Sequence, residues 1–543
     1  MLQSYALDSV YQHHLSQTPN ETMLIQDDQQ ISYLQFEQLV QDTEAWFTEQ
    51  GIQTGDRVAV WLINRVEWLA IFFALARLGA TLVAVNTKYR AHEVHYILTN
   101  SQANFLILQL NFRKIDFAEV IQDVDASNLV HLKKIMMVDA DEQTPAQLLN
   151  RPVAPFVPKL KNATSATRND PHSQPRQPDP KFADLPVIFF TTSGTTKGPK
   201  LVVHTQRTLS EHARHVAQSY HFGEPNDILL TALPFCGVYG LNSTLATIAA
   251  KMPVVLMDFF DVASASHLIR QYQITHIFGS DEMLRRFAEQ NPEPIAFPSL
   301  KLFGFAAFSA RFIELAQTLA PRGYPMRGLY GSSEVHALFS AQQPSLPLEE
   351  RALGGGTPAA GALAHVRVRD PDSQTLCAAG VSGEIEIYSP TLFKGYYNNT
   401  EATAHAFTQD GYFKTGDLGY LRDDGSFVYQ SRVGDTMRLG GFLVDPTEIE
   451  HVLADQPEIE SAQVVGIEIN GQPRAVAFAI ATNKQTTPDP TAILKSIATT
   501  LAAFKIPAHL WFVNEFPTTA SANGQKFQRV KLRELAEQNL RNS

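Results

Sequence analysis

Cysteine and clustered positive charge are scarce in this chain. Only two cysteines, Cys236 and Cys377, occur in 543 residues, which excludes a disulfide framework and a zinc site built from cysteines. Lysine and arginine total 44 against 55 aspartates and glutamates, so the net charge is −11. A nucleic-acid-binding surface needs gathered positive charge. We therefore expect no nucleic-acid partner.

Long apolar runs are scarce as well. Residues 1–20 lack the apolar segment of a secretory signal, and we expect a cytoplasmic protein. The longest apolar stretch, 68–85, contains Arg77 and Gly79. These residues favour a buried helix followed by a buried strand over an integral membrane span.

Apolar segments alternate with amphipathic ones from residue 57 onward. Strands that are apolar throughout are typical of parallel sheets with helices on both faces, so the fold class is α/β. A length of 543 residues also indicates more than one domain. The expected strands are 57–63, 81–85 and 104–108, and the expected helices are 67–79 and 92–101.

Two changes of pattern divide the chain. Residues 151–186 contain eight prolines, which predicts a surface connection without helix or central strand. A helix start follows at 445–448, where an aspartate, a proline and an acidic first turn occur together. Further along we expect strands 462–469 and 474–482, a turn at Asn470-Gly471 and a helix at 491–503. We predict a large N-terminal multi-sheet α/β domain, 1–431, and a small mobile α+β C-terminal domain, 432–543.

The loop after the apolar strand 187–190 is rich in hydroxyl groups, glycine and lysine. Such a loop can cradle phosphate oxygens with hydroxyl, backbone N–H and ammonium donors, although it can also be an ordinary turn. It is not a P-loop, because Pro199 follows Gly198. The candidate residues are Thr191, Thr192, Ser193, Gly194, Thr195, Thr196 and Lys200.

Four more motifs follow this loop in a fixed order. They are Tyr330-Gly331-Ser332-Ser333-Glu334, Tyr412-Phe413-Lys414-Thr415-Gly416-Asp417, Arg432 with Asp435 and Gly440-Gly441, and Gly524-Gln525-Lys526. Together the five motifs resemble the adenylate-forming superfamily of acyl- and aryl-CoA synthetases, peptide-synthetase adenylation domains and luciferases. In the loop itself, Lys197 takes the place of a family glycine.

The resemblance implies two half-reactions. A carboxylic acid and MgATP give an acyl-AMP and pyrophosphate, and a thiol, expected to be coenzyme A, then displaces AMP. The implied cofactors are ATP, Mg²⁺ and coenzyme A. A carrier-protein phosphopantetheine as acceptor, or a non-catalytic nucleotide-binding relative, are the alternatives. Cys236 follows Phe235 where peptide synthetases carry an aspartate, so fatty or aromatic acids are favoured over amino acids.

Roles for individual residues also follow from the resemblance. Glu334 is expected to bind Mg²⁺, Asp417 the ribose hydroxyls and Arg432 ribose or phosphate oxygens. From the residues alone, each of these three could equally be a solvated or turn-forming side chain. Lys526 and Thr192 are expected to be catalytic, Lys526 by stabilising the negative charge between two anions. Further nucleotide contacts are expected from Gly304, Phe305, Ala306, Tyr330, Gly331, Ser332 and Ser333.

The acid pocket departs from the family pattern. Gly237 stands at the family's histidine position, and the bulky Phe305 replaces a glycine, so we expect a rearranged pocket wall. The expected pocket residues are Phe235, Gly237, Val238, Tyr239 and Gly279. Gly434 is the expected hinge, and Gly440 and Gly441 are expected beside coenzyme A. We expect no metal at His212 and no nucleophilic role for Cys236, whose apolar neighbourhood raises a thiol pKa.

Overall fold

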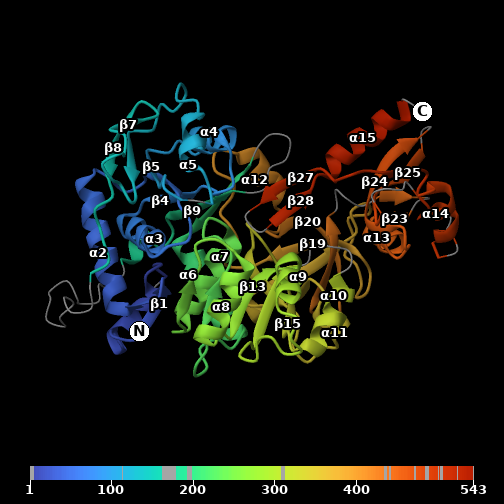
Figure 1. Cartoon of the computed structure of the whole chain (residues 1–543), viewed down its shortest axis with the longest axis horizontal. Coiled ribbons are helices and arrows are strands. Elements are labelled where there is room, and N and C mark those ends of the chain that lie inside the picture. The colour runs from blue at the N-terminus through green and yellow to red at the C-terminus, as the bar shows by residue number, and fades with distance from the viewer. Residues whose placement is uncertain are drawn as a thin grey trace.

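The computed structural model shows a large α/β body and a smaller C-terminal part (Figure 1). The structure describes residues 5–112, 114–161, 179–191, 199–306, 312–432, 437–439, 442–444, 446–469, 472–483, 488–498, 500–501, 505–521 and 524–541.

The first of the two large sheets has eight strands. In spatial order they are β10 (Leu201–Thr205), β9 (Pro186–Thr191), β4 (Thr81–Ala84), β3 (Arg57–Trp61), β5 (Phe105–Leu108), β6 (Lys134–Met137), β8 (Arg151–Pro155) and β7 (Gln147–Leu148). Strands β4, β3, β5 and β6 run parallel, as the apolar segments predict.

Both faces of this sheet are covered. Val58 and Val60 of β3 pack into one hydrophobic core, whereas Ala59 and Trp61 pack into another. A strand buried on both faces must be apolar at every position, which explains the continuous apolar run. The covering helices here are α2 (Tyr33–Glu49), α3 (Val66–Leu78), α4 (Ala91–Asn100) and α5 (Phe117–Gln122).

The second large sheet has thirteen strands. In spatial order they are β18 (His365–Arg369), β19 (Gly383–Tyr388), β20 (Phe413–Leu421), β21 (Phe427–Arg432), β17 (Gly355–Pro358), β16 (His336–Ala341), β15 (Met326–Ser332), β14 (Leu302–Ala306), β13 (His276–Ser280), β11 (Leu229–Thr231), β12 (Val254–Leu256), β1 (Thr22–Gln26) and β2 (Gln29–Ser32). Pairing is parallel from β12 to β15 and antiparallel from β16 to β18. The sheet therefore changes its mode of pairing at β15.

Helices pack against this sheet and around the N-terminus. They are α1 (Ser9–Gln17), α6 (Gln206–Ser219), α7 (Val238–Ala249), α8 (Val262–Tyr272), α9 (Asp281–Gln290), α10 (Phe312–Leu319), α11 (Leu348–Arg351) and α12 (Thr400–Ala406). No helix among the described residues is both long and apolar enough to cross a membrane.

The proline-rich stretch contains more structure than its composition predicts. Residues 151–155 form β8, which pairs parallel with β6 on one side and antiparallel with β7 on the other. The expectation of a connection without helix or central strand is therefore wrong for these five residues, because β8 has a neighbouring strand on each side. Prolines are tolerated near the margin of a sheet, and β8 is the second strand from its edge. Residues 162–178 lie outside the described part of the chain.

The C-terminal strands form separate small sheets. They are β22 (Met437–Leu439), β23 (Phe442–Val444), β24 (Ile459–Ile469), β25 (Gln472–Ala481), β26 (Leu510–Phe512), β27 (Thr518–Ser521) and β28 (Gly524–Phe527), with helices α13 (Pro446–Ala454), α14 (Pro490–Ile497) and α15 (Arg529–Arg541). The pairing of β24 with β25 and the start of α13 match the sequence, while α14 ends earlier than expected. The expected turn at Asn470-Gly471 lies outside the described residues. The division at 431/432 and the mobility of the second part stay predictions.

A buried ionic cluster ties α3 to the N-terminal helices. The Arg77 guanidinium donates to both carboxylate oxygens of Glu37 at 3.0 and 2.8 Å and to Asp8 at 3.2 Å. It also donates to the Tyr11 hydroxyl at 3.0 Å. All four side chains are buried, so each charge depends on its partners for solvation.

Replacing Arg77 with methionine is expected to destabilise the fold strongly, because two carboxylates would then remain buried without their counter-charge. We expect the free energy of unfolding to fall by about 3–5 kcal/mol, measured by urea denaturation. Arg285→Met is the control, since Arg285 pairs with Glu282 and Glu289 on the surface. That change should cost less than about 1 kcal/mol. Equal losses in the two variants would contradict the prediction.

Candidate active site

The turn between β15 and β16 lies where the large sheet changes from parallel to antiparallel pairing. A Cβ at Gly331 would stand 2.4 Å from the carbonyl oxygen of His336, so the two backbones meet too closely for any side chain. The backbone N–H of Glu334 donates to the Ser332 hydroxyl at 3.2 Å. The turn is therefore tight, and it fixes the position of Glu334.

Glu334 is held by a tyrosine from a distant segment. The Tyr396 hydroxyl donates to Glu334 Oε1 at 3.0 Å, and the Lys200 ammonium lies 4.5 Å from the centre of the Tyr396 ring. Burial, together with the Glu334 charge, raises the pKa of Tyr396, so the phenol remains a donor. A carboxylate and a lysine thus both contact one aromatic side chain.

Asp417 forms a second polar centre. It lies within β20, and its side chain is 4% exposed. It accepts a hydrogen bond from the Tyr330 hydroxyl at 2.6 Å, and it forms an ion pair with Arg432, whose Nε lies 2.8 Å away. Asp417 raises the pKa of Arg432, while burial and then Asp417 raise that of Tyr330. The motif residues Tyr330, Asp417 and Arg432 therefore meet, from β15, β20 and β21.

Part of the candidate phosphate loop is described. Thr191 ends β9, and its hydroxyl accepts a hydrogen bond from Tyr89 at 3.0 Å. Lys200 directly precedes β10. The predicted contacts Thr192, Ser193, Gly194, Thr195 and Thr196 lie outside the described residues.

The expected acid pocket follows β11. Gly237 is the N-cap of α7, and Phe235 is fully buried with its ring 5.4 Å from that of Trp68. The Tyr239 hydroxyl donates to the Gly304 carbonyl at 3.1 Å, which places Tyr239 over β14. Val238 is buried beside it.

Gly279 of β13 and Gly304 of β14 lie on neighbouring strands, and side chains at these two positions would face opposite sides of the sheet. A Cβ at Gly304 would meet the rings and methyls of Phe278 and Leu329, on the face where Tyr239 lies. A Cβ at Gly279 would instead meet Met283 of α9. A side chain at Gly279 would therefore face α9, whereas the Gly279 backbone hydrogen-bonds to the Tyr239 hydroxyl and lies beside the expected pocket.

The Phe305 ring lies on the face of β14 opposite to the one on which Gly304 and Tyr239 meet, because residues alternate in direction along a strand. It stacks on Phe312 of α10, with centroids 4.1 Å apart and planes at 28°. The backbone of Phe305 and of Ala306 lies at the end of β14. The effect of Phe305 on the pocket wall stays a prediction.

The C-terminal candidates are described only in part. The backbone of Lys526 belongs to β28 and pairs with Thr519, but its side chain is outside the described set. Gly434, Gly440 and Gly441 lie outside it as whole residues.

Three buried histidines under the β15–β16 turn were missed in the sequence. The His336 ring stacks on His212 with centroids 4.4 Å apart and lies 4.0 Å from His204. Nε2 of His204 donates to the Ser333 carbonyl at 2.7 Å, and Nε2 of His212 to the Ala337 carbonyl at 2.7 Å. The stack therefore supports the backbone that carries Glu334. Each residue sits on a different element, so no spacing in the sequence reveals the group.

The described residues were also searched for a metal site and for a reactive thiol. No group of three or more potential ligands among histidine, cysteine, aspartate and glutamate could hold a metal ion within the part of the chain that the structure describes. Burial raises the pKa of Cys236 to about 11, so the thiol is protonated at neutral pH. A Mg²⁺ ion held by Glu334 would not need such a group, since Mg²⁺ prefers one or two carboxylates together with substrate phosphates.

Family profiles match most of the chain. Residues 11–397 match the profile described as AMP-binding enzyme, and residues 448–523 match the AMP-binding enzyme C-terminal domain. The chain belongs to the AMP-binding enzyme family. Within the adenylate-forming superfamily it is an acyl-CoA synthetase, an AMP-forming acid–CoA ligase that uses ATP, Mg²⁺ and coenzyme A.

Relatives of similar length support this family membership. The chain is 26% identical to the 2-succinylbenzoate–CoA ligase of Bacillus subtilis (strain 168), over 93% of each chain. It is 28% identical to the crotonobetaine/carnitine–CoA ligase of Escherichia coli O45:K1 (strain S88 / ExPEC), covering 90% of this chain and 91% of the relative. The fold is similar to that of ATP-bound MatB from Rhodopseudomonas palustris, with a TM-score of 0.78, 23% identity and coverage of 98% and 99%.

The histidine stack should make this AMP-binding enzyme sensitive to acid. Burial lowers the pKa of His204 to about 4 and that of His212 to about 3, whereas an unfolded histidine titrates near 6.5. The unfolded state therefore binds more protons below pH 6.5, and the stability present above that value is lost as the pH falls toward 4. We expect urea midpoints measured at pH 7.5, 6 and 5 to fall steadily.

His212→Gln tests the source of this slope. The variant should be less stable at pH 7.5. Its stability should also decline less steeply toward pH 5, because it lacks one histidine whose protonation is disfavoured in the folded state. The control is His131→Gln at an exposed histidine, which should retain the wild-type slope. An unchanged slope in His212→Gln would assign the acid sensitivity elsewhere.

Proposed function

We propose that this AMP-binding enzyme activates a fatty or aromatic carboxylic acid and transfers it to coenzyme A. The observation that carries this proposal is the approach of two polar centres to the junction of the large sheet. One contains Glu334, Tyr396 and Lys200, and the other contains Asp417 with its partners. Ligands of open α/β sheets bind beyond the carboxyl ends of the parallel strands, and β15 is the last of these.

Each centre suits one part of ATP. Asp417 can accept hydrogen bonds from the ribose hydroxyls, as acidic residues do in other nucleotide sites. Arg432 can donate to ribose or phosphate oxygens, and its ion pair with Asp417 holds the guanidinium in place. Glu334 would hold Mg²⁺, which neutralises phosphate charge when bound. Lys200 and Thr191 supply donors to the phosphate tail.

The acid is expected on the α7 side of the sheet. Phe235, Val238 and Tyr239 give this side an apolar and aromatic character, and an unpaired substrate ammonium would be costly beside them. These contacts favour fatty or aromatic acids over amino acids. The relatives named above act on 2-succinylbenzoate and on crotonobetaine or carnitine, so related enzymes differ widely in their acids.

A screen of acids tests the proposal. Pyrophosphate release from MgATP is measured with short, medium and long fatty acids, aryl acids and amino acids, each with and without coenzyme A. Release that depends on a fatty or aromatic acid and ends in AMP and a thioester supports the proposal. Bound acyl-AMP without a thioester favours a carrier-protein phosphopantetheine as acceptor. No release with any acid favours a non-catalytic nucleotide-binding relative.

Glu334→Gln is expected to weaken the response to Mg²⁺. The amide keeps the size and can still accept from Tyr396, but it lacks the charge that a hard cation requires. The Mg²⁺ concentration at half-maximal pyrophosphate release should rise by about tenfold or more. An unchanged Mg²⁺ titration would make Glu334 a structural residue of the turn.

Lys526→Ala is expected to separate the two half-reactions. Loss of an ammonium that stabilises the transition state should lower single-turnover adenylation by about a hundredfold or more. Thioester formation from supplied acyl-AMP should remain near that of the unmodified enzyme. Lys531→Ala, also in the basic C-terminal segment, is the matched control and should leave both steps intact. Adenylation that survives in Lys526→Ala would assign the role to another residue.

A further inference from the structure

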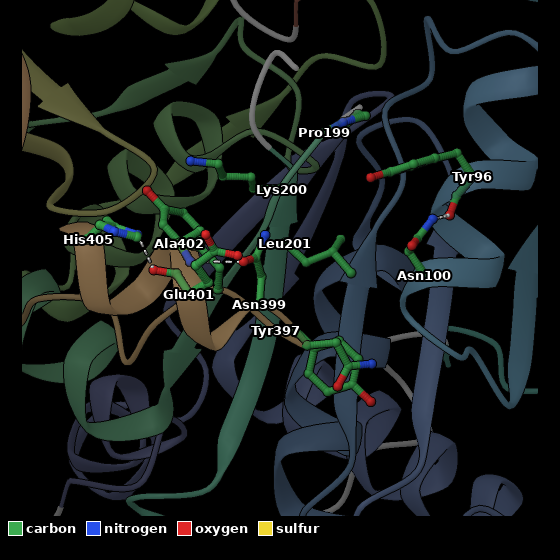
Figure 2. A pocket seen from close by; sticks show the side chains of 12 residues that line it. Tyr96, Asn100, Pro199, Lys200, Leu201, Tyr397, Asn399, Glu401, Ala402 and His405 are labelled. Atoms are coloured by element: carbon green, nitrogen blue, oxygen red, sulfur yellow. Dashed lines mark hydrogen bonds between the residues drawn. The ribbon is translucent and has the colours of Figure 1, made fainter. Parts of the chain in front are cut away.

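A pocket of about 380 Å³ opens beside the candidate nucleotide site (Figure 2). It lies between α4, the segment that leads into β10, and the residues from Tyr396 into α12. We call it the side pocket.

The side pocket is polar rather than apolar. Tyr96 and Asn100 line it from α4, Lys200 from the opposite wall, and Asn399, Glu401 and His405 from the α12 side. In Figure 2 the Tyr96 hydroxyl points from α4 toward the Lys200 side of the pocket, while the Lys200 side chain extends away from Tyr96, toward the side on which Glu401 and His405 lie. Hydroxyl, amide and ammonium donors of this kind suit a small, hydrated anion.

The side pocket and the candidate nucleotide site share one wall. Lys200 and Tyr396 line the side pocket, and the Tyr396 hydroxyl also holds Glu334 at 3.0 Å. A phosphate group beside Glu334 is thus separated from the side pocket by one aromatic ring and one lysine. The lysine can serve either side by rotating its flexible stem.

We propose that the side pocket holds inorganic pyrophosphate on its way out of the adenylation site. The inference rests on the proposed function, in which the carboxylate oxygen bonds to the α-phosphorus of ATP. The bond from that phosphorus to the bridging oxygen then breaks, and this oxygen leaves with the β- and γ-phosphates as pyrophosphate. Pyrophosphate then moves past Lys200 into the side pocket, while acyl-AMP remains beside Asp417.

Glu401 sets the strength of this holding site. It is exposed and is the acidic member of the lining, so it repels a bound anion in water by a modest amount. Nδ1 of His405, one helical turn later, hydrogen-bonds to the Glu401 carbonyl, 2.9 Å away. A site with one lysine and one opposing carboxylate binds pyrophosphate weakly, as release requires.

The test measures pyrophosphate binding while AMP occupies the candidate nucleotide site. The full-length enzyme is first titrated with Mg²⁺ and a non-hydrolysable ATP analogue. A second sample is saturated with AMP, which carries no β- or γ-phosphate for Lys200 to contact, and inorganic pyrophosphate is then titrated by calorimetry. We expect one further binding event. Its dissociation constant should rise about fivefold in His405→Glu and fall about threefold in Glu401→Gln. His365→Glu, the same charge change at an exposed histidine on β18, should leave it unchanged.

The outcomes distinguish the two proposals. Failure of the ATP analogue to bind would contradict the proposed function itself. Normal analogue binding without a second pyrophosphate event would overturn the side pocket alone. The side-pocket proposal would also be overturned if His405→Glu changed the affinities for the analogue and for pyrophosphate equally. Pyrophosphate would then occupy the ATP phosphate site.

Discussion

The candidate site depends on the close backbone approach between Gly331 and the carbonyl of His336. This approach allows β15 to pair parallel with β14 and, across a tight turn, antiparallel with β16. A side chain at Gly331 would force these strands apart. Both polar centres depend on this contact, because Tyr330 precedes it and Glu334 lies in the turn. The histidine stack beneath the turn supports the same stretch of backbone.

Local charge arrangement explains how an acidic chain can hold a polyanion. The net charge is −11, yet Lys200 lies over an aromatic ring and Arg432 is aligned by Asp417. A cation that is already positioned needs less reorganisation when charge develops nearby. The Arg77 cluster uses the same physics for a different purpose, since its buried charges stabilise one another. The ion pair between Asp417 and Arg432, which we propose to contact ATP, differs from the Arg77 cluster because it is partly exposed.

The parallel core and strands β24 and β25 could be predicted because burial on both faces leaves continuous apolar runs in the sequence. Strand β8 could not, because its prolines contradict strand propensity and only its place near a sheet edge makes them tolerable. Glu334, Asp417 and Arg432 were proposed through motif resemblance, which fixes residue types but not contacts. Tyr396 and the histidine stack were missed, since they join elements far apart in the chain. The face of β14 that the Phe305 ring occupies could not be predicted either, because composition does not tell which face of a strand a ring occupies.

The bond between Tyr330 and Asp417 spans 87 positions of sequence. During synthesis the parallel strands up to β15 leave the ribosome first, because a chain is made and folded from its N-terminal side. The proposed nucleotide site cannot form at that stage, because Asp417 and Arg432 follow Tyr330 out of the ribosome much later. Until β20 and β21 arrive, the Tyr330 hydroxyl has no Asp417 to bond, and the edge of β15 awaits its antiparallel neighbours. A nascent chain of this enzyme would gain ATP affinity in one late step, well after most of its secondary structure.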